Sequence, residues 1–305
     1  MVYSSIHRLD LNLVRVFVAV FETASVTLAA ERLFVTQPSV SYALARLREL
    51  FGDPLFTRTA DGMQPTLCAQ AAYRHFSEGL ACIGDGWESL QTFQAAASAR
   101  RFRISMSDIG ELAFLPPLMA LLHQQAPEVT LEVVAPAMEQ IPAQLASGQI
   151  DAAVGHLPAI AGVTQSISLF EERYVCLLRQ EHPLVGGPLT LEGYLAARHA
   201  YVTAPASGHH MIEQVLQARG LRRNIALQIP HFTALPTLIA HSDLLATIPS
   251  RAAAMLATYE PLHILPLPVD LPALDVRLHW HAKRESNAAL AWFLEVVRRA
   301  LEPLG

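Results

Sequence analysis

Residues Thr36 to Thr59 read TQPSVSYALARLRELFGDPLFTRT, and this stretch decides how the N-terminal part of the chain folds. Thr36 is a good helix N-cap, and Pro38 fits the first turn, where a missing N–H costs nothing. Gly52, with Asp53-Pro54 beyond it, is typical of a helix end. The stretch therefore predicts one helix between Thr36 and Gly52.

The two faces of this helix differ in chemistry. Val40, Leu44 and Leu47 recur at helical spacing and form the inward stripe. The outward side is polar, and such side chains read DNA: glutamine pairs with adenine, hydroxyl groups bond base edges or phosphates, and proline or tyrosine can contact a thymine methyl group. A polar face that is only solvated is the alternative. The expected contacts on this helix are Thr36, Gln37, Pro38, Ser39, Ser41, Tyr42 and Arg46.

The flanking segments predict a small helical domain with a wing. Leu11, Val14, Val18 and Phe21 recur at helical spacing, and a second short helix is expected to follow Thr27. Residues 55–65 read as two extended arms around a turn at Asp61-Gly62, a strong hairpin signal. We expect Arg58, on the first arm, to reach a phosphate or the adjoining minor groove.

Charge gives this domain only a weak electrostatic footprint. Residues 1–66 contain six arginines and six acidic residues. The whole chain carries a formal net charge of -5, which argues against nonspecific polyanion binding by the entire molecule. Any DNA binding must therefore depend on one face.

Length and composition indicate a multi-domain protein with a large core. The chain has 305 residues, of which 52% are hydrophobic and 16% charged. Its longest nearly unbroken apolar run, Leu112 to Leu122, is shorter than the roughly 20 residues of a membrane span. No signal peptide is visible, so a cytoplasmic location is expected.

Cysteine and histidine patterns predict neither a disulfide framework nor a metal centre. Cys68, Cys82 and Cys176 are scattered and are expected to be buried thiols. His279 and His281 share one strand face, but no carboxylate or cysteine completes a ligand set. No cofactor is expected, and the chain shows no catalytic motif that would indicate an enzyme.

A long helix is predicted from Thr66 onward. Its apolar residues alternate four and three positions apart, which is typical of the seam of a two-helix coiled coil. The helix is therefore expected to form a dimer, and packing on its own domain is the alternative. The seam residues are Phe76, Leu80, Ile83, Trp87 and Leu90.

The remainder alternates strand-like and helix-like runs, which predicts an α/β domain. Ser107 or Asp108 is expected to cap the first helix, with Glu111 completing a capping box. Two crossings of one boundary, near Tyr174 and near Val276, predict two lobes with a cleft between them. Strands are expected at 102–106, 129–134, 150–155, 174–179, 200–203, 225–229, 244–248 and 276–282, with a closing helix at 286–301 that returns to the first lobe.

Several motifs together resemble the winged helix-turn-helix of LysR-type transcriptional regulators. They are Ala29-Ala30-Glu31-Arg32-Leu33, Thr36-Gln37-Pro38-Ser39-Val40-Ser41, Leu47 and Asp53-Pro54-Leu55-Phe56-Thr57-Arg58. The resemblance implies DNA contacts at Gln37, Pro38, Ser41, Tyr42 and Arg58. The family often has arginine, asparagine or histidine where Tyr42 stands.

The second half resembles the LysR-type effector domain, which is itself similar to periplasmic binding proteins. Segments such as Tyr174-Val175-Cys176-Leu177 and Trp280-His281-Ala282-Lys283 resemble the branch that regulates naphthalene, salicylate and nitroaromatic degradation and, more distantly, nodulation. In that branch two histidines and an arginine contact an aromatic carboxylate. They map to Arg173, His209 and Arg251 here, with arginine replacing the first histidine.

The cleft between the lobes is the expected effector site, because ligands bind at the carboxyl ends of strands in α/β sheets. Free N–H groups at Ser107 and Asp108 can face an anion, although an ionised Asp108 would repel a carboxylate, so we expect it to act first as a cap. The expected effector contacts are Ser107, Asp108, Ile109, Arg173, His209, Pro249 and Arg251.

These expectations combine into one domain scheme. Residues 1–66 form the winged helix-turn-helix, residues 67–94 the linker helix and residues 95–305 the effector domain. Lobe I is expected at about 101–173 and 278–305, and lobe II at about 174–277. The implied partners are double-stranded DNA, a small aromatic acid, RNA polymerase and further copies of the chain, as a homodimer or homotetramer.

Two other classes of protein share parts of this pattern. A two-lobed solute-binding protein would have the same cleft, but it needs export and has no use for residues 1–94. A small enzyme on the same scaffold would need a nucleophile or metal set in the cleft, and the sequence offers none.

Overall fold

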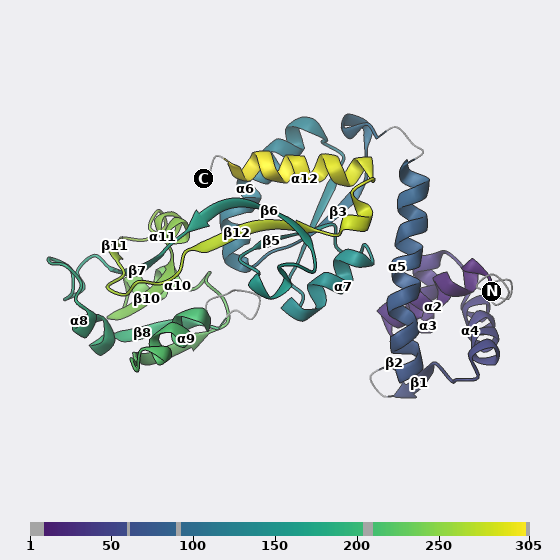
Figure 1. Cartoon of the computed structure of the whole chain (residues 1–305), viewed down its shortest axis with the longest axis horizontal. Coiled ribbons are helices and arrows are strands. Elements are labelled where there is room, and N and C mark those ends of the chain that lie inside the picture. The colour runs from purple at the N-terminus through teal and green to yellow at the C-terminus, as the bar shows by residue number, and fades with distance from the viewer. Residues whose placement is uncertain (1–8, 60–61, 90–92, 204–209, 303–305) are drawn as a thin grey trace. The chain divides into compact units, whose positions relative to one another are not determined.

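The computed structural model describes residues 9–59, 62–89, 93–203 and 210–302 (Figure 1). Contacts divide the chain into an N-terminal unit, Met1–Leu90 with Ala146–Gly148, and a C-terminal unit, Gln91–Leu145 with Gln149–Gly305. Among the described helices, none has the length and apolar character needed to span a membrane.

The N-terminal unit consists of short helices, a hairpin and one long helix. Its elements are α2 (Leu11–Thr23), α3 (Val26–Leu33), α4 (Gln37–Phe51), β1 (Phe56–Thr59), β2 (Gly62–Pro65) and α5 (Leu67–Ser89). The prediction for α4 is confirmed, because the Thr36 side chain accepts a hydrogen bond from the Ser39 N–H and Gly52 ends the helix at a φ of 63°. The predicted start of α3 after Thr27 is wrong: the Ser25 side chain caps Leu28 N at 3.3 Å.

Phe17 lies at the centre of the N-terminal core. Its ring centroid is 5.4 Å from that of Phe56 on β1 and 5.4 Å from that of Phe76 on α5. Aromatic pairs at this separation stabilise a core beyond simple area burial. The same core therefore holds both the wing and the long helix.

The predicted coiled-coil seam is divided between two environments. Phe76 packs against the core of its own unit, as the alternative interpretation of this helix required. Ile83 and Trp87 are exposed, with Trp87 at 68%. Leu90 lies outside the described residues. The second half of α5 thus keeps an apolar face that the N-terminal unit does not cover.

Gly62 fixes the wing against the turn between α2 and α3. Its φ is 111°, and a Cβ atom at this position would lie 2.7 Å from the carbonyl oxygen of Ala24. That same oxygen accepts a hydrogen bond from Met63 N at 2.8 Å. Only glycine permits this close approach. Asp61, the other residue of the predicted turn, lies outside the described residues.

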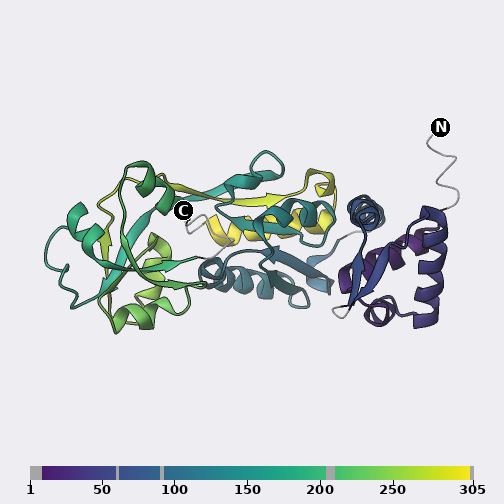
Figure 2. The same cartoon turned by 90° about the horizontal axis from the view of Figure 1, so that it is seen from below.

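The C-terminal unit contains a sheet in each of two lobes. Its strands are β3 (Arg101–Ser105), β4 (Thr130–Val134), β5 (Ala152–Gly155), β6 (Gln165–Glu172), β7 (Tyr174–Arg179), β8 (Arg198–Val202), β9 (Asn224–Ile229), β10 (Leu244–Pro249), β11 (Leu262–Pro266) and β12 (Leu274–Trp280). The first lobe has strand order β4-β3-β5-β12-β6, and the second has β11-β7-β10-β8-β9. Figure 2 shows the two lobes from a second side.

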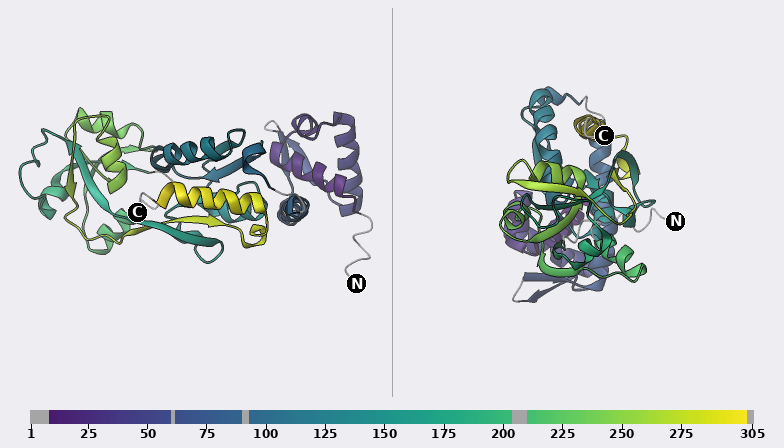
Figure 3. Two further views of the ribbon diagram at one scale, coloured as in Figure 1. Left: turned by 90° about the horizontal axis from the view of Figure 1, so that it is seen from above. Right: turned by 90° about the vertical axis from the view of Figure 1, so that its left-hand side faces the viewer.

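Helices cover these sheets. They are α6 (Asp108–Gln125), α7 (Ile141–Ala146), α8 (Leu191–Ala196), α9 (His210–Ala218), α10 (Leu235–Ala240), α11 (Ser250–Leu256) and α12 (Ala288–Leu301), with short 3-10 turns at Ala95–Ala97, Met138–Gln140, Pro158–Ile160 and Ala282–Arg284. The return of the last helix, drawn in yellow in Figure 3, to the first lobe is confirmed. Phe293 of α12 stacks on Phe102 of β3, with the ring centroids 4.3 Å apart.

The chain passes between the lobes twice, as predicted. Only Arg173 separates β6 in the first lobe from β7 in the second, and residues 267–273 lead back from β11 to β12. β6 and β12 run side by side in Figure 1 and pair antiparallel from Gln165–Trp280 to Glu172–Leu274. The sequence did not predict β6 or β11. β6 was not predicted because its residues are mostly polar and only some of them are buried.

Two local predictions need correction. Ser107 caps α6, with its side chain accepting from Gly110 N, so Asp108 already lies in the first turn and the capping box with Glu111 does not form. Of the cysteines only Cys176 is buried, while Cys68 is half-buried and Cys82 exposed. Burial raises the pKa of the Cys176 thiol to about 12, which keeps it protonated and unreactive.

Two buried histidines should make this fold sensitive to acid. Burial lowers the pKa of His199 and of His279 from 6.5 to about 4. Both rings stay neutral in the folded state, so their contribution to stability is complete above pH 6.5 and falls as the pH drops toward 4. Each should add a slope of up to about 1.4 kcal/mol per pH unit to the unfolding free energy in this window.

Denaturant unfolding between pH 7 and pH 4 measures this slope. His279→Gln should flatten it, because the variant lacks a buried histidine that takes up a proton on unfolding. The exposed control His241→Gln should leave it unchanged. An unchanged slope in His279→Gln would contradict the assignment.

Candidate nucleic-acid interface and effector pocket

A groove on the N-terminal unit brings together residues from three parts of the sequence. Gln37 and Ser41 on α4 and Arg58 on β1 line it together. Thr27 at the start of α3 and Arg48 on α4 line the same groove. Amide, hydroxyl and guanidinium groups in one concave surface match the donors and acceptors of DNA base edges and phosphates.

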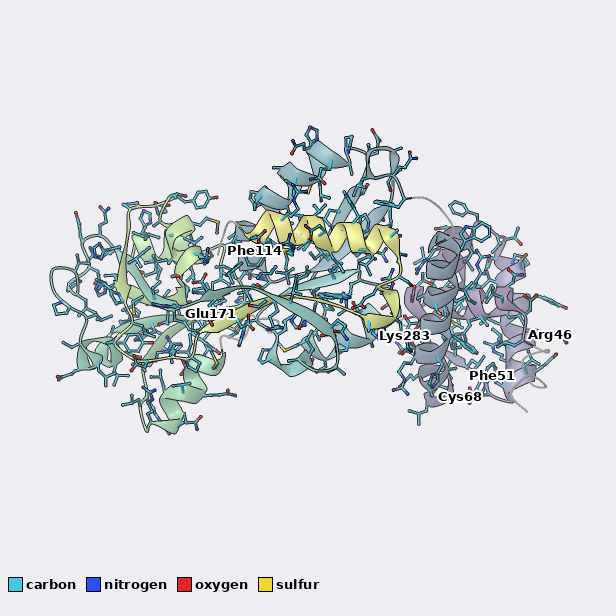
Figure 4. All side chains as sticks on the ribbon, turned by 45° about the horizontal axis from the view of Figure 1, so that its top comes forward. Arg46, Phe51, Cys68, Phe114, Glu171 and Lys283 are labelled. Carbon is cyan, nitrogen blue, oxygen red and sulfur yellow. The ribbon has the colours of Figure 1, made fainter. Side chains whose placement is uncertain are left out.

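The other predicted DNA contacts lie outside this groove, on the exposed N-cap Thr36 and on exposed parts of α4. The hydroxyl oxygens of Thr36 and Ser39 are 2.8 Å apart, which holds the start of the helix. Tyr42 is 73% exposed. Arg46 lies on the outer side of the unit (Figure 4), with Nη1 3.6 Å from Oε2 of Glu49. An ion pair this exposed is weak, so Arg46 remains available to a phosphate.

Several charges of the N-terminal unit have internal structural partners. Arg32 pairs with Glu22, which also accepts from the Tyr73 hydroxyl at 2.9 Å. Asp53 accepts from Leu55 N at 2.7 Å and from the Thr66 hydroxyl at 2.8 Å. These contacts fix the elements of the unit relative to one another and compensate its charge. The acidic residues that keep the net charge of this unit low therefore also hold its elements together.

A pocket opens between the two lobes of the C-terminal unit. Its first-lobe wall comes from the start of α6 and the ends of β5, β6 and β12, and its second-lobe wall from Tyr174 and the segment around Arg251. The wall is mainly apolar, with a few polar groups. The lining residues are Ser105, Met106, Ser107, Ile109, Gly110, Ala113, Phe114, Ile141, Val154, Gly155, His156, Leu157, Phe170, Glu172, Tyr174, Pro249, Arg251, Ala252, Leu274 and Val276.

Arg251 is the cation of this pocket, and it is held from two sides. Its guanidinium carbon lies 4.5 Å from the centroid of the Phe170 ring. Its Nε lies 3.4 Å from Oε2 of Glu172, a carboxylate that is almost completely buried. The ring and the carboxylate together fix where the guanidinium points.

The remaining polar groups of the pocket have distinct chemistry. His156 Nδ1 lies 3.2 Å from the carbonyl oxygen of Asp275. Since a carbonyl only accepts, this hydrogen bond requires the proton on Nδ1 and leaves Nε2 as the acceptor of a neutral ring. Burial raises the pKa of the Tyr174 phenol well above its usual value, so it remains a neutral hydroxyl.

The structure brings together four of the effector contacts expected from the sequence. Ser107, Ile109, Pro249 and Arg251 all line the pocket. Arg173 is exposed and does not line it, and its carbonyl oxygen accepts from Ser250 N at 2.8 Å. His209 lies outside the described residues.

Asp108 joins the two lobes and does not line the pocket. Its Oδ2 accepts a hydrogen bond from Phe232 N at 2.5 Å and lies 4.0 Å from Nδ1 of His231. Phe232 is buried in the second-lobe core, where Ile109 of α6 also packs. The start of α6 is therefore fastened to the second lobe by the Asp108–Phe232 hydrogen bond and by the apolar side chains of Ile109 and Leu112.

Sequence reasoning missed Glu172, His156 and Phe170 as pocket residues. Glu172 and Phe170 lie on β6, a strand that was not predicted, so their inward direction could not be inferred. His156 directly follows a strand, and its position beyond the carboxyl end of β5 was the one available signal.

Two family models match nearly all of the chain. Residues 11–70 match the bacterial regulatory helix-turn-helix protein, lysR family. Residues 95–302 match the LysR substrate binding domain.

Known proteins and solved structures resemble the chain over almost its entire length. The HTH-type transcriptional activator NahR of Pseudomonas putida is 37% identical over 289 residues, which cover 95% of this chain and 96% of NahR. The HTH-type transcriptional activator NagR of Ralstonia sp is 35% identical, with 94% and 96% covered. The crystal structure of probable transcriptional regulator PA0477 from Pseudomonas aeruginosa is 37% identical with a TM-score of 0.68, covering 97% of this chain and 98% of that one.

The role of Asp108 as a connection between lobes can be measured directly. Asp108→Ala removes the carboxylate that accepts a hydrogen bond from the Phe232 N–H, and losing a hydrogen bond of this kind costs about 1–3 kcal/mol. We expect faster hydrogen exchange at the Phe232 amide and a lower melting temperature. Glu111→Ala, one turn further along α6, is the matched control and should leave the Phe232 amide unchanged. Equal exchange at Phe232 in both variants would refute the connection.

Proposed function

Because the chain belongs to the LysR family of bacterial transcriptional regulators and is not an enzyme, we propose that its groove between α4 and β1 reads duplex DNA and that an aromatic carboxylate in the interlobe pocket modulates this binding. The observation that carries the proposal is the convergence of Gln37, Ser41 and Arg58 on one groove, in the unit that precedes a domain with an apolar, arginine-containing pocket.

The exposed face of α4 supplies the base contacts in this proposal. Gln37 and Ser41 lie one turn apart at the start of the helix, where side chains reach base edges in the major groove. Pro38 and Tyr42 offer apolar surface to a thymine methyl group. Thr36, Ser39 and Arg46 take phosphates, and Arg58 on the wing takes a phosphate or the minor groove.

Oligomerisation compensates for the low charge of the DNA-binding unit. One such unit has few free cations, and phosphate neutralisation dominates nonspecific affinity. A dimer through the exposed part of α5, at Ile83 and Trp87, joins two units and multiplies their affinities. We propose a homodimer as the basic state and a homotetramer on the promoter.

The chemistry of the interlobe pocket favours a small aromatic acid. Phe114, Phe170 and aliphatic side chains provide an apolar wall that suits a ring. Arg251 offers guanidinium donors that suit a carboxylate, and Ser107 adds a hydroxyl. Asp108 is turned away toward Phe232, so its charge does not repel the ligand from within the pocket.

Linkage between the two sites gives the regulatory mechanism. An effector that contacts both lobes favours one arrangement of the lobes over another, in proportion to its difference in affinity for the two. In an oligomer this changes the spacing of the DNA-binding units, and through it the contact with RNA polymerase.

DNA recognition is tested with promoter DNA from the region next to the gene. The double variant Gln37→Ala, Ser41→Ala should bind this DNA more weakly than the parent at physiological salt, because a good bidentate pair alone provides about 1–3 kcal/mol of discrimination. Gln70→Ala, an exposed glutamine on α5, is the control. Arg58→Ala should reduce the slope of log affinity against log salt by about 0.9. A double variant that binds as tightly as the parent would refute this reading surface.

Effector binding is tested by calorimetric titration of salicylate. Arg251→Ala removes charge-assisted hydrogen bonds, which typically contribute about 1.5–3 kcal/mol, so affinity should fall at least about tenfold. Arg222→Ala, an exposed arginine outside the pocket, should bind as the parent does. Equal heats in the parent and Arg251→Ala, or no heat in either, would exclude this pocket.

A further inference from the structure

Glu172 is an almost completely buried carboxylate whose acceptor capacity is fully used. Its Oε1 accepts from the Ser250 hydroxyl at 2.5 Å, from Ser250 N at 3.1 Å and from Arg173 N at 2.9 Å. Its Oε2 accepts from Arg251 N at 3.3 Å and faces the Arg251 guanidinium at 3.4 Å. A carboxylate has about four lone-pair positions, so these contacts leave none for other partners.

The donors around Glu172 are the groups that an external carboxylate would use. Arg251, Ser250 and the backbone N–H groups of residues 250 and 251 form an anion site at the edge of the pocket, and a side chain of the protein already occupies it. A ligand entering the pocket therefore meets an ion pair, whose net charge is zero, and not an isolated arginine. The Glu172 carboxylate also repels a second carboxylate placed near Arg251.

We infer that Glu172 is an internal counter-anion that competes with an acidic effector for Arg251 and so sets the affinity and the charge selectivity of the pocket. This inference rests on the proposed function, in which the effector carboxylate pairs with Arg251.

The position of Glu172 couples this competition to the connection between the lobes. Glu172 is the last residue of β6, directly before the Arg173 crossing, while Ser250 and Arg251 begin α11 in the second lobe. Its carboxylate thus joins the first-lobe strand to the second-lobe helix. An effector that draws Arg251 toward itself weakens this link. Occupancy of the pocket therefore changes the contacts at the Arg173 crossing between the lobes.

Glu171 provides a matched comparison one position away. It lies on the same strand (Figure 4), where side chains alternate between faces. Glu171 is exposed and does not line the pocket. Removing its charge changes the net charge of the protein by the same amount but leaves Arg251 paired.

The experiment is a double-mutant cycle on the full chain with two probes. Salicylate is the anionic probe, and salicylamide is its neutral counterpart of nearly equal shape. The measured quantity is the ratio of the two affinities in the parent, Glu172→Gln, Arg251→Gln and the double variant Glu172→Gln, Arg251→Gln. Calorimetry gives the affinities, and Glu171→Gln is the control.

Glu172→Gln should raise the preference for salicylate at least about tenfold, because the guanidinium loses its internal partner and the ligand loses a repelling charge. Arg251→Gln should lower the preference for salicylate below the parent value, since the Glu172 charge then lacks its guanidinium partner and repels the ligand carboxylate. The double variant should return to within about threefold of the parent, because it removes two charges that offset each other. Glu171→Gln should match the parent.

Each other result has a definite meaning. An unchanged or lower preference in Glu172→Gln overturns the inference while leaving the proposed effector class intact. If that variant does not fold, the double variant decides, since a neutral pair of similar shape avoids an uncompensated buried charge. A preference more than about tenfold below the parent in the double variant then overturns the inference. Absence of salicylate binding to all these proteins overturns both the inference and the proposed effector class.

Discussion

The C-terminal unit depends on the way its chain passes between two sheets. A single residue, Arg173, joins β6 to β7, so the two strands stay adjacent where the chain passes from one lobe to the other. The Glu172 carboxylate reinforces this passage by accepting hydrogen bonds from the first residues of α11. Because a buried carboxylate is costly unless fully paired, this network also limits which arrangements of the lobes are stable. The pocket lies beside it and shares Arg251 with it.

A similar constraint operates in the N-terminal unit, where one ring organises the surface. Phe17 contacts Phe56 of the wing and Phe76 of α5, so the groove containing Gln37 and Arg58 is built on a core that extends into the long helix. Since well-packed cores deform little, the wing and α4 keep their relative positions. The exposed side chains of Ile83 and Trp87 on α5 lie beyond this core.

Local signals predicted α4, whose two ends are both capped. Thr36 and Gly52 delimited α4 because a cap depends on residues that are neighbours in sequence. The same reasoning failed at Asp108, whose carboxylate binds Phe232, a residue 124 positions away. It also failed for β6, where a partly polar strand gains its stability from pairing with β12. Long-range partners leave no local pattern, so Glu172 could not be recognised as part of the pocket.

Local signals predicted the helix-turn-helix with its wing and the alternation of strands and helices, since caps, turns and periodicity act over a few residues, and the quoted motifs resembled those of one family. The sequence also named Gln37, Ser41, Arg58 and Arg251, which the structure places on two concave surfaces. The contacts of the folded chain show that Asp108 joins the lobes, that Phe76 packs inside its own unit and that Arg251 already has a carboxylate partner. Those outcomes follow from contacts between segments far apart in the chain. For Asp108 and Arg251, the distance to the partner and the burial of both groups fix the energy of the charge, so residue type alone could not reveal it.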